Sequence, residues 1–142
     1  MILVYDGDCG LCRTCLALVL VVDRARRVTP LTLDEATARG LAAGVSDERW
    51  RASWHALGAD GGLWSGGAAV APLLRELGLP SVAALAERAP GVVERAYRAV
   101  AVRRGPLGRW IPGGVLRWAD RVIAARASPS ARARARSSAA GG

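Results

Sequence analysis

The hydrophobic positions at the start of the chain follow a strand–helix–strand order. Residues 1–5 are apolar and stop at Asp-Gly-Asp, a pattern that predicts a buried strand ending in a turn. From residue 10 to about residue 23 the apolar residues recur at helical spacing, which predicts a mostly buried helix. Residues 27–33 alternate and are rich in Val, Thr and Leu, so we expect a second strand. Pro30 favours an edge position for it, because proline cannot donate a ladder hydrogen bond.

The middle of the chain predicts a helix, a hairpin and a second helix. Asp34 is a favourable N-cap for the first of these helices, and glycines close both of them. Glycines between two apolar segments predict the turn of an antiparallel hairpin. In order, the expected segments are a helix over 34–43, a strand over 51–57, a turn over 58–62, a strand over 63–65 and a helix over 66–77. Further helical stretches run from residue 81 to about residue 102.

The order of these segments, β-α-β-α-β-β-α, predicts an α/β fold. A strand–helix–strand unit followed by a hairpin and a packing helix is the thioredoxin-like arrangement, in which helices flank a mixed sheet. We expect this domain to span residues 1–112, with further helices toward the C-terminus. Residues 113–127 predict an amphipathic helix. Residues 128–142 are a basic, low-complexity tail of Ala, Arg, Ser and Gly, in which we expect no fixed structure.

Length and charge narrow the class of protein. With 142 residues, of which 51% are hydrophobic, the chain has room for one folded domain and a tail. The net charge of +8 comes from twenty arginines in a chain without lysine, which indicates coding bias more than a nucleic-acid partner. No apolar run approaches the roughly 18 to 20 residues of a spanning helix, and no basic segment precedes the first apolar run as in a signal peptide. We therefore expect a cytoplasmic protein.

The dense cluster of reactive side chains is Asp6-Gly-Asp-Cys-Gly-Leu-Cys12. In a reducing compartment, cysteines so close together are more often catalytic or metal-binding than a structural disulfide. When a helix begins within CxxC, its unpaired N–H groups and positive end stabilise a thiolate, so we expect Cys9 to attack and Cys12 to resolve the mixed disulfide. Asp6 and Asp8 either oppose that thiolate or accept its proton as a general base, and the sequence leaves both roles open.

The segment YDGDCGLC, directly after an apolar strand, resembles the signature of the DCC family of thiol-disulfide oxidoreductases. The segment over 54–69, WHALGADGGLWSGGAA, is similar to the hairpin and helix start of that family. The resemblance implies a thioredoxin-like fold, a role in thiol-disulfide exchange for Asp6, Cys9 and Cys12, no cofactor, and a thiol or disulfide as substrate. One departure concerns thioredoxins in general, which place a cis-proline before the third strand. No proline precedes Ser53 closely in this chain.

A metal site is the first alternative. Cys9, Cys12 and Cys15 form CxxCxxC, and His55 is available as a fourth ligand for zinc, while three thiolates also suit an Fe–S cluster. The pattern is incomplete, because zinc sites usually draw on two separated ligand pairs and ferredoxin runs need a fourth cysteine. Cys15 lies one turn beyond Cys12, and we expect it to pack as a small hydrophobic residue.

Two further alternatives invoke other parts of the chain. Asp6 and Asp8 after a strand match the opening of haloacid-dehalogenase-type phosphatases, but that class relies on a downstream lysine, and the chain contains none. In a non-catalytic interpretation the protein acts through its basic C-terminal segment, with residues 115–127 on an anionic membrane or a partner. The same residues are as well suited to packing on the domain.

Overall fold

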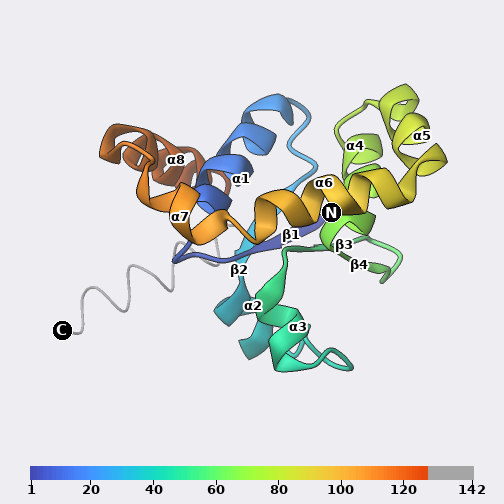
Figure 1. The fold of residues 1–142 in the computed structure, drawn as a ribbon, viewed down its shortest axis with the longest axis horizontal. Coiled ribbons are helices and arrows are strands. Elements are labelled where there is room, and N and C mark those ends of the chain that lie inside the picture. Colours follow the sequence, from blue (N-terminus) through green and yellow to red (C-terminus); the bar gives the residue numbers. More distant parts are fainter. Residues whose placement is uncertain (128–142) are drawn as a thin grey trace.

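A four-stranded mixed sheet forms the centre of the computed structural model, which describes residues 1–127 (Figure 1). The strand order is β2-β1-β3-β4. Strand β1 pairs parallel with β2 and antiparallel with β3, and β3 and β4 form the antiparallel hairpin. The strands are β1 (Ile2–Tyr5), β2 (Thr29–Thr32), β3 (His55–Leu57) and β4 (Leu63–Ser65). The predicted α/β fold with a mixed, thioredoxin-like sheet is confirmed, and Pro30 lies on the edge strand β2 as expected.

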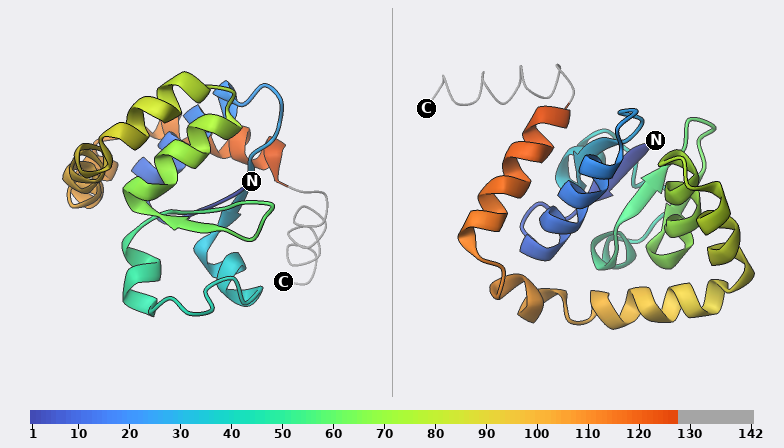
Figure 2. Two further views of the ribbon diagram at one scale, coloured as in Figure 1. Left: turned by 90° about the vertical axis from the view of Figure 1, so that its right-hand side faces the viewer. Right: turned by 90° about the horizontal axis from the view of Figure 1, so that it is seen from above.

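Helices cover both faces of this sheet. In Figure 1, α1 and α4 lie above the strands, while α2 and α3 lie below them. The view from above shows α8 running beside α1, with α7 and α6 passing along one end of these helices (Figure 2). The helices are α1 (Gly10–Val22), α2 (Leu33–Ala38), α3 (Asp47–Ala52), the 3-10 helix η1 (Gly66–Ala69), α4 (Val70–Glu76), α5 (Pro80–Arg88), α6 (Pro90–Ala101), α7 (Arg104–Arg109) and α8 (Gly113–Arg126).

Two predicted boundaries are wrong. The strand expected over 51–57 begins only at His55, because residues 51 and 52 complete helix α3. Acidic residues in the first turn and arginines in the last turn favour that helix, and Trp50 anchors it by lying 2% exposed in the core. The helix expected over 34–43 ends at Ala38, and Gly40 follows with φ of 73°, a left-handed conformation that stops a helix.

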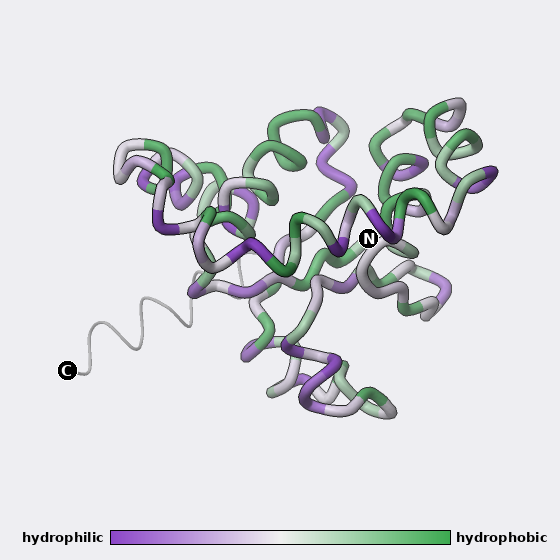
Figure 3. The backbone as a smooth tube through the Cα atoms, in the orientation of Figure 1, coloured by the Kyte–Doolittle hydropathy of each residue, from purple (hydrophilic) through white to green (hydrophobic). Residues whose placement is uncertain are grey.

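The alternation of β1 divides the core into two layers. Leu3 and Tyr5 point to the face covered by α1, α4 and α8, whereas Val4 joins the cluster under α2 and α3. Helix α8 contributes Ile123 to the first layer, so its apolar face is covered by the domain. Figure 3 shows hydrophobic residues along α1 and also on α4 and α5. Within residues 1–127, the helices are too short or too polar to cross a membrane.

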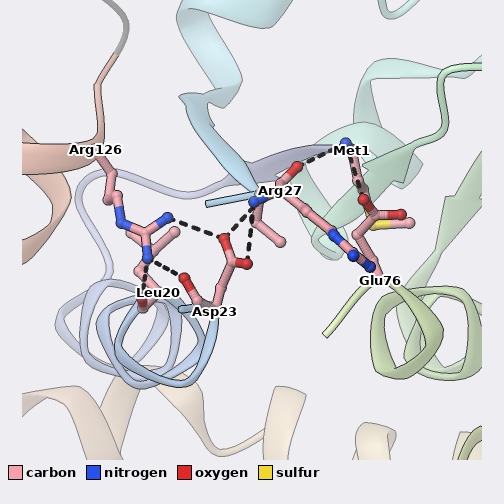
Figure 4. A network of polar contacts seen from close by, with 7 residues as sticks. Met1, Leu20, Asp23, Arg27, Glu76 and Arg126 are labelled. Atoms are coloured by element: carbon pink, nitrogen blue, oxygen red, sulfur yellow. Dashed lines mark hydrogen bonds and ion pairs between the residues drawn. The ribbon is translucent and has the colours of Figure 1, made fainter. Parts of the chain in front are cut away.

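An ionic network at the C-terminal end of α1 ties α8 to the domain (Figure 4). The Asp23 carboxylate, 2% exposed, accepts hydrogen bonds from the backbone N–H groups of Arg27 and Val28 at 3.0 and 2.9 Å. Arg126 on α8 completes the set, with Nη1 donating to Asp23 Oδ2 at 3.0 Å and Nη2 donating to the Leu20 carbonyl at 2.6 Å. The Leu20 carbonyl belongs to the last turn of α1, where carbonyls lack partners within the helix. Arg126 therefore also caps this helix.

The same contacts set the ionisation of Asp23. Burial alone would raise the pKa of this carboxyl, but the hydrogen bonds from Val28, Arg27 and Arg126 outweigh it and lower the pKa below its usual value. A carboxyl whose pKa is lower in the folded than in the unfolded state stabilises the fold at pH values above its unfolded pKa. That contribution is lost as the pH falls through the folded pKa.

We expect Arg126→Ala to lower the free energy of unfolding by about 2 kcal/mol at pH 7, since it leaves the buried Asp23 carboxylate without its cation. Urea denaturation followed by circular dichroism measures this, with Arg121→Ala on the exposed side of α8 as the matched control. The deficit should begin to shrink as the pH falls below about 4, where the unfolded chains take up a proton at Asp23, and should vanish only below the lowered folded pKa, where Asp23 is protonated in the folded wild type as well. A deficit independent of pH, or an equal loss in the control, would contradict this account.

Candidate functional site: a dithiol at the start of α1

Cys9 is the N-cap residue of α1, directly after the turn that ends β1. Its backbone is extended, with φ of −86° and ψ of 110°, and its Sγ accepts the backbone N–H of Cys12 at 3.3 Å. A serine or aspartate oxygen commonly fills this position, so the cysteine sulfur takes the place of the usual cap. One N–H group of the first turn therefore donates to a sulfur, and a negatively charged sulfur accepts such a bond better than a neutral thiol does.

Asp6 stabilises the turn that places Cys9 at the start of α1. Its carboxylate Oδ1 accepts the Asp8 backbone N–H at 3.0 Å, and its carbonyl accepts the Cys9 N–H at 3.4 Å. This is the hydrogen-bonded turn that an aspartate side chain forms with the backbone two residues further on. Asp8, in contrast, is exposed at the tip of the turn. The two carboxylates that the sequence places together thus have different surroundings.

Cys12 lies behind Cys9, one helical turn further along α1, and is partly buried. Burial raises the pKa of the Cys12 thiol well above its ordinary value, and a hydrogen bond with Cys9 and the charges of Cys9 and Asp6 raise it further. The positive charge of Arg104 acts in the opposite direction. Cys12 is therefore a protonated thiol at neutral pH, beside the sulfur of Cys9.

Cys15 is the most exposed of the three cysteines, all of which are free thiols. Neighbouring protein atoms still remove part of its thiol from water, and this raises the pKa of Cys15, to which the charge of Cys9 adds. The expectation that Cys15 packs as a small hydrophobic residue is wrong, because the outer side of α1 leaves it open to solvent.

Helix α7 lies directly against the start of α1. A Cβ atom on Gly10 would come within 3.2 Å of the Gly108 carbonyl oxygen and of Leu116 Cδ2, closer than packed atoms normally approach. Two glycines, one on each helix, allow the backbones to approach this closely. Further along α1, Arg13 donates both a 2.8 Å hydrogen bond from Nε and a second one from Nη2 to the Asp120 carboxylate on α8. The dithiol is thus held by segments distant in the sequence.

Tyr97 and Arg104 complete the surroundings of Cys12, and no sequence motif pointed to either residue. The Tyr97 hydroxyl accepts the backbone N–H of Trp54 at 3.3 Å. Arg104 donates to the carbonyls of Arg51 and Ala52, at 2.9 and 3.3 Å, at the end of α3. Trp54 immediately precedes β3, the place where thioredoxins carry their cis-proline, so Tyr97 engages the main-chain N–H at that place.

His55 does not belong to the cysteine cluster. It is fully buried, stacks on Trp50 with ring centroids 4.2 Å apart, and bonds the Trp50 carbonyl through Nε2 at 2.8 Å and Ser65 Oγ through Nδ1 at 2.7 Å. Because a carbonyl only accepts, Nε2 carries the proton, and Nδ1 accepts from Ser65. Burial lowers the pKa of His55, although the bond to the Trp50 carbonyl opposes this. With both nitrogens engaged, His55 is a structural residue.

The three cysteines also do not form a ligand set with other residues. Within the described residues 1–127, no three His, Cys, Asp or Glu side chains gather as a metal site requires. Asp6 and Asp8 likewise lack a third acidic partner for the magnesium site of a phosphatase. The arrangement suits chemistry carried out by two sulfur atoms.

Two clefts open beside the dithiol. One, of about 540 Å³, is lined by the turn of Asp6, Gly7 and Asp8 and by neighbouring strands and helices. The other, of about 550 Å³, lies between α3, the end of β4 and α6. Arg104 lines both clefts and separates them.

This combination of a mixed four-stranded sheet and a CxxC at the start of its first helix defines a thioredoxin-like dithiol protein. The sequence model of the DCC1-like thiol-disulfide oxidoreductase family matches residues 3–110. The chain belongs to this family, which confirms the resemblance drawn from its N-terminal motif. Neither the curated proteins nor the solved structures contain a match to the chain.

The different surroundings of the thiols predict an order of alkylation. In the reduced protein at pH 8, we expect iodoacetamide to modify Cys12 and Cys15 slowly, since only the thiolate reacts and the pKa of both is raised. Cys9→Ser should accelerate the modification of Cys12, because it removes the charge of Cys9 and its hydrogen bond. Peptide mass spectrometry over time measures each site. Unchanged Cys12 reactivity in Cys9→Ser would contradict the coupling between the two sulfurs.

Proposed function

We propose that the protein is a thiol-disulfide oxidoreductase that exchanges its Cys9–Cys12 dithiol with a substrate disulfide. One observation carries the proposal: the Cys9 sulfur caps α1 and accepts the Cys12 N–H, while the Cys12 thiol stays protonated directly behind it. The sulfur proposed to attack and the sulfur proposed to resolve the mixed disulfide thus lie in different surroundings at the same helix end. The substrate is a thiol or disulfide of a protein or small molecule.

In the first step the Cys9 thiolate attacks one sulfur of the substrate disulfide. A bond forms between Cys9 Sγ and that sulfur, the substrate S–S bond breaks, and the second substrate sulfur leaves as a thiolate that takes a proton from water. In the mixed disulfide Cys9 no longer carries a negative charge. The charge that raised the pKa of Cys12 is then gone, so Cys12 ionises more easily at this stage.

In the second step the Cys12 thiol loses its proton to solvent and attacks Cys9 Sγ. The Cys9–Cys12 disulfide forms, the bond to the substrate breaks, and the remaining substrate sulfur leaves as a thiol after protonation. The substrate has gained two electrons and the dithiol has lost two. An external thiol reductant returns the dithiol to its starting state, and the reverse sequence oxidises a dithiol substrate.

Asp6 and Asp8 have separate roles in this proposal. Asp6 is a positioning residue, because its carboxylate holds the turn and its charge helps to keep Cys12 protonated. Asp8 is the exposed carboxylate beside Cys9, on the solvent side of the turn, and in this proposal it passes the proton released by Cys12 on to solvent.

A redox titration tests the exchange mechanism. We expect Cys9 and Cys12 to titrate together as one two-electron couple in dithiothreitol buffers, with Cys15 remaining a free thiol. Cys12→Ser should accumulate a mixed disulfide at Cys9 with a model disulfide, because the resolving sulfur is missing. Trapping with a maleimide and locating each thiol by peptide mass measures both effects.

Cys15→Ser serves as the matched control for that titration, and it should leave the midpoint and the mixed-disulfide behaviour unchanged. If the three thiols titrate independently, or if Cys12→Ser accumulates no adduct at Cys9, the exchange mechanism is wrong.

Two substitutions of Asp6 distinguish the effect of its charge from its structural role in the turn. Asparagine retains an oxygen that accepts the Asp8 N–H but has no charge, whereas alanine removes both. We expect Asp6→Asn to shift the pH profile of Cys12 alkylation to lower pH and to change the exchange rate only a few-fold. Asp6→Ala should slow exchange more, since the turn loosens. A loss of roughly 100-fold or more in Asp6→Asn would instead identify Asp6 as a general base.

A further inference from the structure

The cleft between α3, β4 and α6, here called the α6 cleft, carries an excess of positive charge. Among the described residues that line it, the charged ones are three arginines and one glutamate: Arg49, Arg98, Arg104 and Glu94. The carboxylate of Glu94 is already engaged, with Oε2 accepting the Gly67 N–H at 3.0 Å and Oε1 accepting from Arg98 Nε at 2.9 Å. The remaining charge of the cleft is therefore cationic.

Arg49 is the cation of this cleft that is most available. It is exposed on α3, and within residues 1–127 it has no hydrogen-bond or ion-pair partner. Arg104, in contrast, is held against the carbonyls of α3. A fixed guanidinium and an unpaired one thus line the same hollow. Arginine pairs with carboxylates through parallel hydrogen bonds, which favours a ligand that bears such groups.

The neighbouring cleft, beside the Asp6 turn, has the opposite character. Four aspartates and three arginines line it among the described residues. Two of these arginines are paired, Arg13 with Asp120 and, at 4.0 Å, Arg51 with Asp34. Asp6 and Asp8 have no cationic partner there within residues 1–127. An anionic group approaching the dithiol is thus repelled on one side of Arg104 and attracted on the other.

The α6 cleft is connected to the dithiol through two of its lining residues, although neither Cys9 nor Cys12 lines it. Tyr97 and Arg104 line the cleft, and both lie near enough to Cys12 to interact with it electrostatically. Tyr97 occupies the Trp54 N–H, so the main-chain pairing that a substrate would otherwise make before β3 is not available. Recognition of a substrate then depends on side chains, which line the α6 cleft. The volume of this cleft lies within the range of ligand-binding sites.

Packing fixes the wall of the cleft. A Cβ atom on Gly67 would lie 2.8 Å from Glu94 Cα, so the glycine allows α6 to rest directly on the start of η1. Helix α6 carries Tyr97 and Arg98, and the cleft therefore has a defined shape.

From these observations we infer that the α6 cleft binds the carboxylate-bearing part of an acidic peptide disulfide and presents its S–S bond to Cys9. This inference rests on the proposed exchange function, and it adds the substrate class. Arg49 holds an acidic side chain of the peptide, Arg104 sets the boundary toward the dithiol, and Asp6 and Asp8 disfavour the opposite orientation.

Charge-matched substrates test it. Three disulfide-linked peptides of equal length carry acidic, neutral or basic residues beside the cysteine, and each is reduced by the full chain at low and high salt. We expect kcat/KM to fall from acidic to neutral to basic, by about fivefold or more per step at low salt, and the differences to narrow at high salt. Arg49→Glu should raise KM for the acidic peptide and lower it for the basic one. Arg88→Glu, an exposed arginine on α5 outside both clefts, is the matched control and should behave as the wild type.

A binding measurement separates this inference from the chemistry. Fluorescence anisotropy of a labelled acidic peptide with serine in place of cysteine is followed with the Cys9→Ser/Cys12→Ser protein. Binding that weakens at least fivefold in Arg49→Glu, and not in Arg88→Glu, supports the cleft. Equal exchange rates for all three peptides together with no selective binding overturn the inference and leave the exchange function intact. Absence of exchange with every peptide overturns the proposed function, and anisotropy then decides on the cleft alone.

Discussion

The capping of α1 by the Cys9 sulfur is the interaction on which the candidate site depends. A helix start leaves backbone N–H groups without partners, and here a sulfur atom, rather than a hydroxyl or carboxylate, accepts one of them. The position follows from the length of β1 and from the turn that Asp6 closes, because together they bring Cys9 to the N-cap position of α1. Cys12 then lies one turn further and deeper, where burial keeps its thiol protonated. One local constraint therefore gives two cysteines three residues apart different surroundings, one as the cap of the helix and the other as a buried, protonated thiol.

The rest of the domain holds this helix at both ends. At its start, Gly10 and Gly108 allow α7 to lie against the dithiol, and at its end Arg126 binds Asp23 and the last carbonyls. Between them Arg13 pairs with Asp120. Helix α8 is thus attached along the length of α1 and shares its core through Ile123. The attachment matters for the site because a helix free to tilt would not hold the two sulfurs at a fixed distance from Tyr97 and Arg104.

The dithiol is surrounded by a hydrogen-bonded tyrosine and by charged side chains. The Tyr97 hydroxyl accepts the Trp54 N–H, which removes a main-chain contact, while arginines outnumber acidic residues in the α6 cleft and aspartates outnumber arginines in the cleft beside the Asp6 turn. The inferred preference for acidic disulfides rests on this difference in charge.

The sequence by itself determined the sheet, the first helix and the dithiol, because each depends on local order: an apolar strand, a turn of Asp and Gly, and cysteines at helical spacing. It also placed Pro30 on an edge strand. It misplaced the start of β3, because the burial of Trp50 in a short helix is a tertiary effect. It treated Cys15 as packed and left His55 open as a ligand, since only the fold shows which face of α1 is covered and which atoms a buried ring meets. Tyr97, Arg104 and the α6 cleft were decided by tertiary structure alone, because side chains from α3, β4 and α6 meet there only after the chain has packed, and no local spacing records that meeting.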